Sequence, residues 1–209
     1  MQEKKHLYIV LTRSGMPIST LMQKMNISFY THACISFNKE LTKMYTFGTL
    51  YTLDPFHTGL KKESIYRDFY LAKPYIPVKV IEVTVNKEQY CKACLAVHYL
   101  IKHHHEFSFN TIGMLFHILR ISTPRPKKFF CSEFVYTLLR DIGVVNFWKP
   151  PHYVIPDDFN GLSNANTIFE GKLISLQSQL ARFHGEEAKQ YLNKYEEYEE
   201  NEKNEETSV

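Results

Sequence analysis

The segment that most constrains the fold is an unbroken run of β-favouring residues, VKVIEVTV, at positions 78–85. It is the clearest strand in the chain, and Asn86 directly after it is a favourable N-cap for a helix from Lys87 to about His104. The apolar residues of this helix recur at helical spacing: Tyr90, Ala93, Cys94, Val97 and Ile101. Other strands and helices follow without a regular βαβ rhythm, which favours the α+β class.

Short alternating or apolar runs predict further strands at 7–11, 30–37 and 44–48, the last two forming a hairpin. Residues 49–76 are weakly patterned, and we expect a long excursion that walls a substrate cleft. A short helix is expected at 19–25, a second apolar segment at 107–119, an edge strand at 167–174 and a terminal helix from Gln177 to about Tyr198. The prolines at 150, 151 and 156 predict a loop that forms another rim of the cleft.

The charge of the chain is unevenly distributed. Residues 186–209 hold nine glutamates and three lysines, a net charge of −6, whereas the whole chain carries +3. With 44% hydrophobic residues, the body is globular rather than disordered. We therefore predict a single domain over 1–185 and an acidic helix and tail over 186–209 with a disordered end. Because the basic residues form no long run and are not interleaved with aromatic residues, no nucleic-acid partner is expected.

The sequence predicts a cytoplasmic protein without stable membrane insertion. It contains no run of 18 apolar residues, and the apolar stretch 7–11 is too short for a signal-peptide core. In that compartment Cys34, Cys91, Cys94 and Cys131 are expected to be reduced thiols.

A cysteine begins an amphipathic helix in the stretch FFCSEFV at 129–135. The apolar face of this helix ends before Gly143, which is expected at the C′ position. Unpaired N–H groups and the helix dipole at the N-terminus favour the thiolate form of Cys131. Such a thiolate is a nucleophile if a base lies within hydrogen-bond reach.

His32 is the candidate base among ten histidines. In the predicted strand YTHACISF it shares one face with Cys34 and Ser36, while Ala33, Ile35 and Phe37 share the other. A histidine held on a rigid strand opposite a helix-terminal cysteine is the arrangement found in papain-like hydrolases.

These two motifs together resemble the circularly permuted papain-like hydrolases of the NlpC superfamily, the YaeF/YiiX-type amidases. In that family a strand histidine (here YTH32ACISF) precedes by about a hundred residues a cysteine that begins a helix (here FFC131SEFV). The return strand YTFG at 45–48 and the segment FNTIG at 109–113 also resemble small members of the group. The resemblance covers roughly residues 7–160 and implies a permuted papain-like fold. In such a fold an antiparallel sheet packs against the helix that carries the cysteine at its N-terminus.

The resemblance implies that Cys131 is the nucleophile, that His32 is the general base and that the backbone N–H of Cys131 forms part of an oxyanion hole. The family's third polar residue, often Glu, lies about twelve positions after the histidine. Here the window 43–46 reads KMYT and has no carboxylate. Tyr45 is therefore the predicted third catalytic residue, with Thr46 or a backbone carbonyl as alternatives. Glu133, in the first turn of the helix, is assigned a structural role.

No metal or cofactor is predicted. Cys91, Cys94 and His98 share one face of the 87–104 helix near His103–His105, which is conceivable as a zinc site. Because their spacing coincides with the apolar stripe, we interpret the two cysteines as core thiols.

The expected function is a cysteine hydrolase, an amidase or peptidase, that cleaves an amide or ester bond of a small peptide, amide or acyl substrate through a Cys131 acyl-enzyme. A catalytically inactive papain-like binding module is the first alternative, because the expected carboxylate is missing. An acyltransferase is the second, since an amine or alcohol can capture the same acyl-enzyme.

Overall fold

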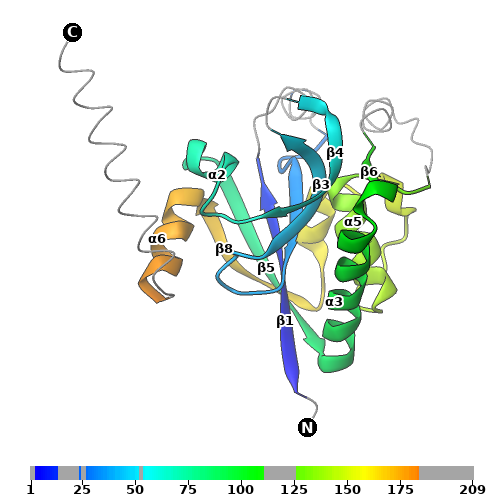
Figure 1. Ribbon diagram of the computed structural model, residues 1–209. Coiled ribbons are helices and arrows are strands. Elements are labelled where there is room, and N and C mark those ends of the chain that lie inside the picture. The colour runs from blue at the N-terminus through cyan, green and yellow to red at the C-terminus, as the bar shows by residue number, and fades with distance from the viewer. Residues whose placement is uncertain (1–2, 14–23, 25–26, 52–53, 111–125, 184–209) are drawn as a thin grey trace, which may run out of the picture.

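The computed structural model describes residues 3–13, 24, 27–51, 54–110 and 126–183. A six-stranded antiparallel sheet, in the order β4-β3-β2-β1-β5-β8, forms its centre (Figure 1). The strands are β1 (Lys4–Thr12), β2 (His32–Ser36), β3 (Met44–Tyr51), β4 (Asp54–Glu63), β5 (Pro77–Asn86) and β8 (Ala165–Lys172). Two short strands, β6 (Ser108–Phe109) and β7 (Lys128–Phe129), pair in parallel beside it.

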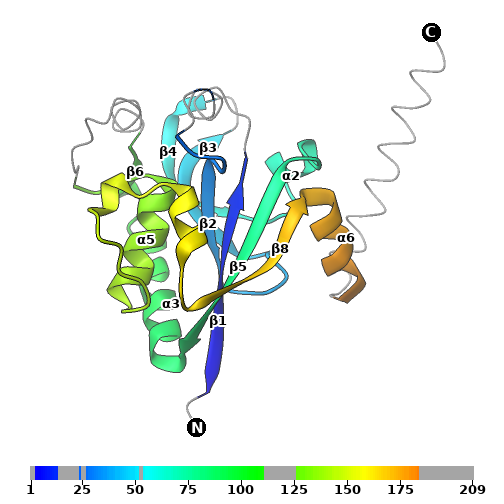
Figure 2. The ribbon, with the colours of Figure 1, turned by 180° about the vertical axis from the view of Figure 1, so that it is seen from behind.

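Helices cover both faces of the sheet. In Figures 1 and 2, α3 (Lys87–Lys102) and α5 (Cys131–Asp141) lie on one side of the sheet, and α2 (Phe69–Ala72) and α6 (Leu173–Phe183) lie on the other. Three short 3₁₀ segments complete the described elements: His104–Glu106, Pro151–Tyr153 and Pro156–Gly161. The chain is thus a mixed α+β protein, as the strand and helix order predicts.

The central strands are buried on both faces. On β1, Leu7, Ile9 and Leu11 belong to the core under α3 and α5, whereas Tyr8 and Val10 belong to the core under α2 and α6. A strand covered on both sides gains from apolar residues at successive positions, which explains why 7–11 reads as a continuous apolar run. Two cores therefore hold the sheet, and β2 is shared between them.

Several sequence predictions are confirmed. The strands at 7–11, 30–37, 44–48 and 78–85 correspond to β1, β2, β3 and β5, and β2 and β3 pair as the predicted hairpin. Asn86 caps α3 by accepting from the N–H of Gln89 while the Gln89 side chain accepts from the N–H of Asn86. Gly143 follows the last turn of α5 with φ of 73°, a left-handed conformation that glycine adopts without strain.

The prediction of an unpatterned excursion over 49–76 is wrong. The chain continues β3 to Tyr51, returns as β4 to Glu63 along the edge of the sheet, and forms α2. The strand was not predicted because the charged residues Lys61, Lys62 and Glu63 resemble a loop. Charged residues are common on edge strands, where they oppose pairing with another chain. Strand β4 also carries Glu63, a residue of the candidate site.

Other predictions fall wholly or partly outside the described residues. They include the helix at 19–25 apart from Lys24, most of the apolar segment at 107–119, the terminal helix beyond Phe183 and the acidic segment 186–209. The edge strand predicted at 167–174 is present as β8, shifted by two residues. Within the described residues, no helix combines the length and the apolar character needed to cross a bilayer.

Candidate active site

Cys131 is the first residue of α5, as the sequence predicts. The helix packs against β2 and β3, and its apolar face is buried in the core that includes Phe134, Val135 and Leu139. Ser132, next in the chain, donates from Oγ to the carbonyl of Val154 at 2.6 Å and ties the loop before the 3₁₀ segment 156–161 to the helix start. The apolar face thus fixes where the helix begins, and the thiol is held against the sheet with 3% of the residue exposed.

His32 begins β2 and is hydrogen-bonded to the Cys131 side chain. Strand β2 pairs with β3 only at residues 35 and 36, so the first residues of β2 are not paired with β3. The backbone N–H of Ala33 instead donates to the Cys131 sulfur. The first residues of β2 therefore supply both a base and a backbone donor to the same thiol.

A carboxylate also contacts His32, and it comes from β4. Nε2 of His32 lies 3.4 Å from Oε2 of Glu63, and Lys61 Nζ lies 3.6 Å from the other carboxylate oxygen, Oε1. Glu63 was not predicted from the sequence, because the carboxylate was expected on the strand directly after His32. The signal that was present is the odd-even alternation over 59–63, which places Gly59, Lys61 and Glu63 on one face of a strand.

His32 lowers the pKa values of Cys131 and Glu63, and both of these groups raise the pKa of His32. Burial by itself lowers the pKa of His32, but Cys34, Glu63 and Cys131 around the ring prevail and raise it well above 6.5. Burial raises the pKa of Cys131, but the hydrogen bond and charge of His32, with the N–H groups of Ala33 and Ser132, outweigh burial and lower it. Burial also opposes ionisation of Glu63, yet mainly His32 holds its pKa at about 2. The arrangement favours a thiolate, an imidazolium and a carboxylate in contact.

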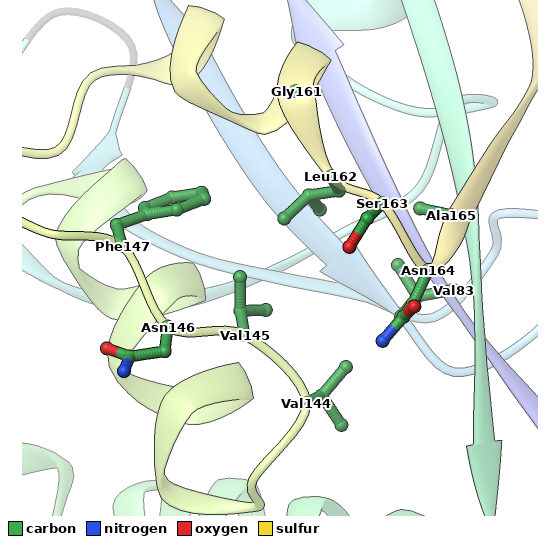
Figure 3. A pocket seen from close by; sticks show the side chains of 10 residues that line it. All are labelled: Val83, Val144, Val145, Asn146, Phe147, Gly161, Leu162, Ser163, Asn164 and Ala165. Carbon is green, nitrogen blue, oxygen red and sulfur yellow. The ribbon is translucent and has the colours of Figure 1, made fainter.

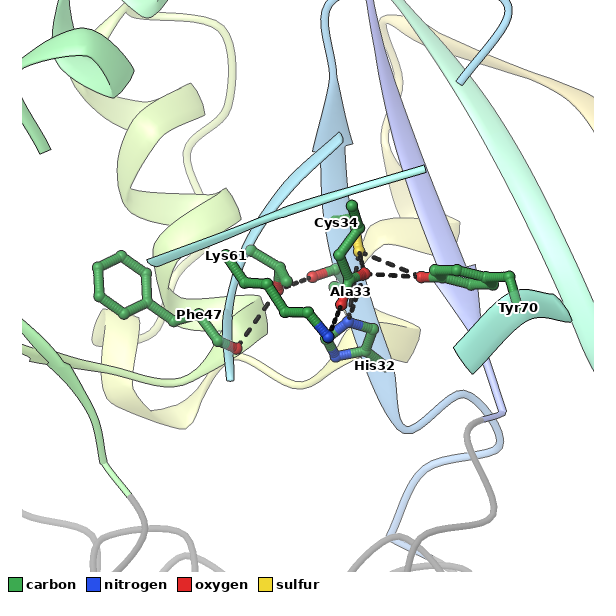
Figure 4. Close-up of polar contacts among 8 residues, drawn as sticks. His32, Ala33, Cys34, Phe47, Lys61 and Tyr70 are labelled. Atoms are coloured by element: carbon green, nitrogen blue, oxygen red, sulfur yellow. Dashed lines mark hydrogen bonds and ion pairs between the residues drawn. The ribbon is translucent and has the colours of Figure 1, made fainter. Parts of the chain in front are cut away.

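A second thiol, that of Cys34, also contacts the imidazole. Cys34 Sγ is 3.3 Å from His32 Nε2, 3.2 Å from Glu63 Oε2 and 3.6 Å from the hydroxyl of Tyr70 (Figure 4). Tyr70, on α2, is 2% exposed and donates to Glu63 Oε2 at 2.9 Å. Burial raises the pKa of Cys34 to about 11, so this thiol is protonated and weakly nucleophilic at neutral pH.

The structure does not bring Tyr45 to His32. Tyr45 stands opposite Ile35 in the β2–β3 ladder and packs edge to face on Phe37, with ring centroids 5.8 Å apart, in the core under α3 and α5. His32 shares the opposite strand face with Cys34. Thr46, the alternative, donates to the carbonyl of Ala33 at 2.8 Å rather than to the imidazole. The side chain that contacts the imidazole is therefore Glu63 and not Tyr45.

Glu133 has the structural role that the sequence predicts. Its Oε2 accepts from the backbone N–H of Phe130 at 3.1 Å, which satisfies a donor at the start of α5. The residue is only 8% exposed, and burial raises its pKa to about 7 despite that hydrogen bond. An ionised carboxylate at this position therefore costs free energy.

This raised pKa predicts a pH-dependent stability. The pKa of Glu133 is about 7 in the folded state and near 4.5 in the unfolded state, so its contribution is complete below pH 4.5 and is lost as the pH rises through 7. Between low and high pH the wild type should lose about 1–2 kcal/mol of unfolding free energy through Glu133, allowing for solvent screening. Glu133→Gln should not show this loss. Urea unfolding at about pH 5 and about pH 8.5 measures it. Glu88→Gln, in the exposed first turn of α3, should keep the wild-type profile, and an unchanged profile for Glu133→Gln would contradict this assignment.

The residues considered as a zinc site on α3 do not converge in the structure. Cys91 is exposed and Cys94 is partly exposed, so the prediction that both are core thiols is wrong for Cys91. Among the described residues, the one group with His, Cys, Asp or Glu ligand atoms close enough to share a metal ion is His32, Cys34 and Glu63.

A pocket of about 130 Å³ is formed by residues outside this cluster (Figure 3). Residues 144–147 and 161–165 line it with Val83, and none of its lining residues is a histidine, a cysteine or a charged residue. It therefore offers no ionisable side chain to act as an acid or a base, and Cys131 and His32 do not line it.

No family model matches the chain, and no curated protein is detectably similar to it.

Proposed function

We propose that the chain is a cysteine hydrolase of the permuted papain-like type, which cleaves an amide or ester bond through an acyl-enzyme on Cys131. The observation that carries this proposal is the contact of one imidazole, His32, with the Cys131 thiol and with the Glu63 carboxylate. A nucleophile, a base and a group that orients the base are the three parts of a catalytic triad. The permuted order, histidine before cysteine, agrees with the family resemblance.

The proposed reaction begins with attack of the Cys131 thiolate on the substrate carbonyl carbon. The carbonyl oxygen gains negative charge, and in this proposal the N–H of Cys131, at the N-terminus of α5, stabilises it. Protonated His32 then gives its proton to the leaving amine or alcohol as the carbon–heteroatom bond breaks. Water, deprotonated by His32, next attacks the thioester, releases the acid and regenerates the thiolate.

Glu63 orients the imidazole and stabilises its protonated form. Its carboxylate, with a pKa of about 2, is ionised at neutral pH, and the Tyr70 hydroxyl and Lys61 fix both of its oxygens. The contact of 3.4 Å between Nε2 and Oε2 is long for a hydrogen bond, as catalytic contacts often are without substrate. The absence of a carboxylate from 43–46 favoured an inactive binding module. Glu63 supplies a carboxylate from β4 instead, and its presence supports an enzyme.

Acylation of the full-length protein by p-nitrophenyl acetate, with EDTA present, tests this function. We expect one acetyl group on the peptide that contains Cys131 and none on this peptide in Cys131→Ala. Exposed Cys91 is the reference thiol in the same sample. Faster decay of the thioester on adding an amine than in water alone would assign acyl transfer. Acylation of Cys131 no faster than that of Cys91 would support a binding module and reject the hydrolase.

A further inference from the structure

Cys34 is a buried thiol that the proposed reaction does not use, yet it lies in the middle of the polar cluster. Its sulfur, Nε2 of His32 and Oε2 of Glu63 form a triangle with sides of 3.3, 3.2 and 3.4 Å. Figure 4 shows Cys34 and His32 on the same strand, with Lys61 and Tyr70 reaching toward them from other elements. A sulfur, a nitrogen and an oxygen thus converge from β2 and β4.

The triangle has the dimensions of one face of a tetrahedral zinc site. Zn²⁺ binds Cys sulfur at about 2.3 Å, His nitrogen at about 2.0–2.1 Å and carboxylate oxygen at about 2.0–2.2 Å. At tetrahedral angles these bond lengths place two ligand atoms about 3.3–3.6 Å apart. The three sides therefore need shifts of only a few tenths of an ångström to accept the ion.

The surrounding groups hold the ligand atoms in place. The hydroxyl of Tyr70 donates to Oε2 of Glu63 at 2.9 Å, and Lys61 pairs with Oε1, so the carboxylate presents Oε2 to the triangle. Such outer contacts orient metal ligands and tighten binding. The side chains of His32 and Glu63 are 20% and 11% exposed, which leaves the ion a way in from solvent.

We propose that His32, Cys34 and Glu63 form a binding site for Zn²⁺, with water as the fourth ligand. Mixed sulfur, nitrogen and oxygen donors suit Zn²⁺ and not Mg²⁺ or Ca²⁺, which take oxygen ligands. Binding releases two protons to solvent, one from the Cys34 thiol and one from Nε2 of protonated His32. Two positive charges leave as two arrive, so the net charge of this largely buried cluster is unchanged.

Zinc at this site would switch off the chemistry proposed for Cys131, a consequence that rests on the proposed function. The ion takes Nε2 of His32 and Oε2 of Glu63, so the imidazole loses both its orienting carboxylate and its positive charge. Because the ion occupies Nε2, His32 can no longer form the imidazolium that the proposed reaction pairs with the Cys131 thiolate. The site therefore acts as an inhibitory metal switch.

Titration of the metal-stripped full-length protein with Co²⁺ tests the site without reference to activity. We expect one equivalent to produce the near-ultraviolet charge-transfer band of thiolate-bound cobalt and tetrahedral visible bands, and Zn²⁺ to abolish both. Cys34→Ser should remove the charge-transfer band and weaken binding by more than about 100-fold, and Tyr70→Phe should weaken it by about 10-fold. Mg²⁺ should not compete.

Matched variants locate the ligands. Cys131→Ser and the double variant Cys91→Ser/Cys94→Ser should keep the cobalt spectrum, and loss of the spectrum in either would overturn the site. Glu63→Gln should also weaken binding, which gives a second ligand test if Cys34→Ser does not fold by circular dichroism. One equivalent of Zn²⁺ should slow alkylation of Cys131 at least tenfold in the wild type but not in Cys34→Ser. Unchanged alkylation with Zn²⁺ bound would overturn the switch. Cobalt binding through Cys34 without any acylation of Cys131 would retain the site and reject the hydrolase.

Discussion

Replacing His32 by alanine is expected to slow alkylation of Cys131 by iodoacetamide at about pH 6 by about 100-fold. The imidazolium lowers the pKa of Cys131, and without it burial raises that pKa above the ordinary value, so the thiolate fraction falls at every pH below it. Well below the pKa, the thiolate fraction falls about tenfold for each unit by which the pKa rises. Mass spectrometry of the Cys131 peptide across a pH series, with EDTA present, measures the rate.

Two comparisons separate this effect from general damage to the fold. His98→Ala removes an exposed histidine on α3 and should leave the Cys131 profile unchanged, as should the rate at exposed Cys91 in every variant. Glu63→Gln should give a smaller loss, about 10-fold, because the imidazole remains but its charge is less stabilised. A Cys131 midpoint near 8.5, unmoved by His32→Ala, would show that the thiolate–imidazolium pair does not exist.

Replacing Phe47 by alanine is expected to destabilise the protein by about 3–5 kcal/mol. Phe47 is fully buried on β3, and its ring centroid lies 5.1 Å from that of Phe129 and 5.3 Å from that of Phe134. These contacts join the sheet to the segment that leads into α5 and to the first turn of the helix. Removing the ring leaves a cavity and takes away the aromatic contacts that position the helix start.

Urea unfolding followed by circular dichroism measures this loss. Trp148→Ala is the matched control, because Trp148 is 99% exposed and its removal should change the free energy of unfolding by less than about 0.5 kcal/mol. Equal effects of the two substitutions would contradict the packing described for Phe47.

The parts of the fold that the sequence predicts are those with strong local signals. The run 78–85, the Asn86 cap and Gly143 each depend on residues within a few positions, and all three appear as expected. The edge strand β4 was not predicted, because its charged end resembles a loop. The hairpin that it forms with β3 is long, so most of its residue pairs lie outside a short sequence window. Local propensity is a weak guide wherever an edge strand must also resist aggregation.

The candidate site divides in the same way. Cys131 and His32 could be named from the sequence, because a helix start and a strand face are local properties. Glu63 could not, since it lies 31 positions after His32 and on a strand one hairpin further along. Tyr45 is nearer in sequence but stands on the opposite face of the sheet, because side chains alternate along a strand.

The sequence by itself determined the two chemical groups at the centre of this protein, the Cys131 thiol and the His32 imidazole, and the α+β class. Only the tertiary structure decided what surrounds them. The β2–β3–β4 register brings Glu63 to the imidazole, and β2 and α2 bring Cys34 and Tyr70 to the same carboxylate. Contacts between residues far apart in the chain depend on register and on how the layers pack, and no local pattern records either.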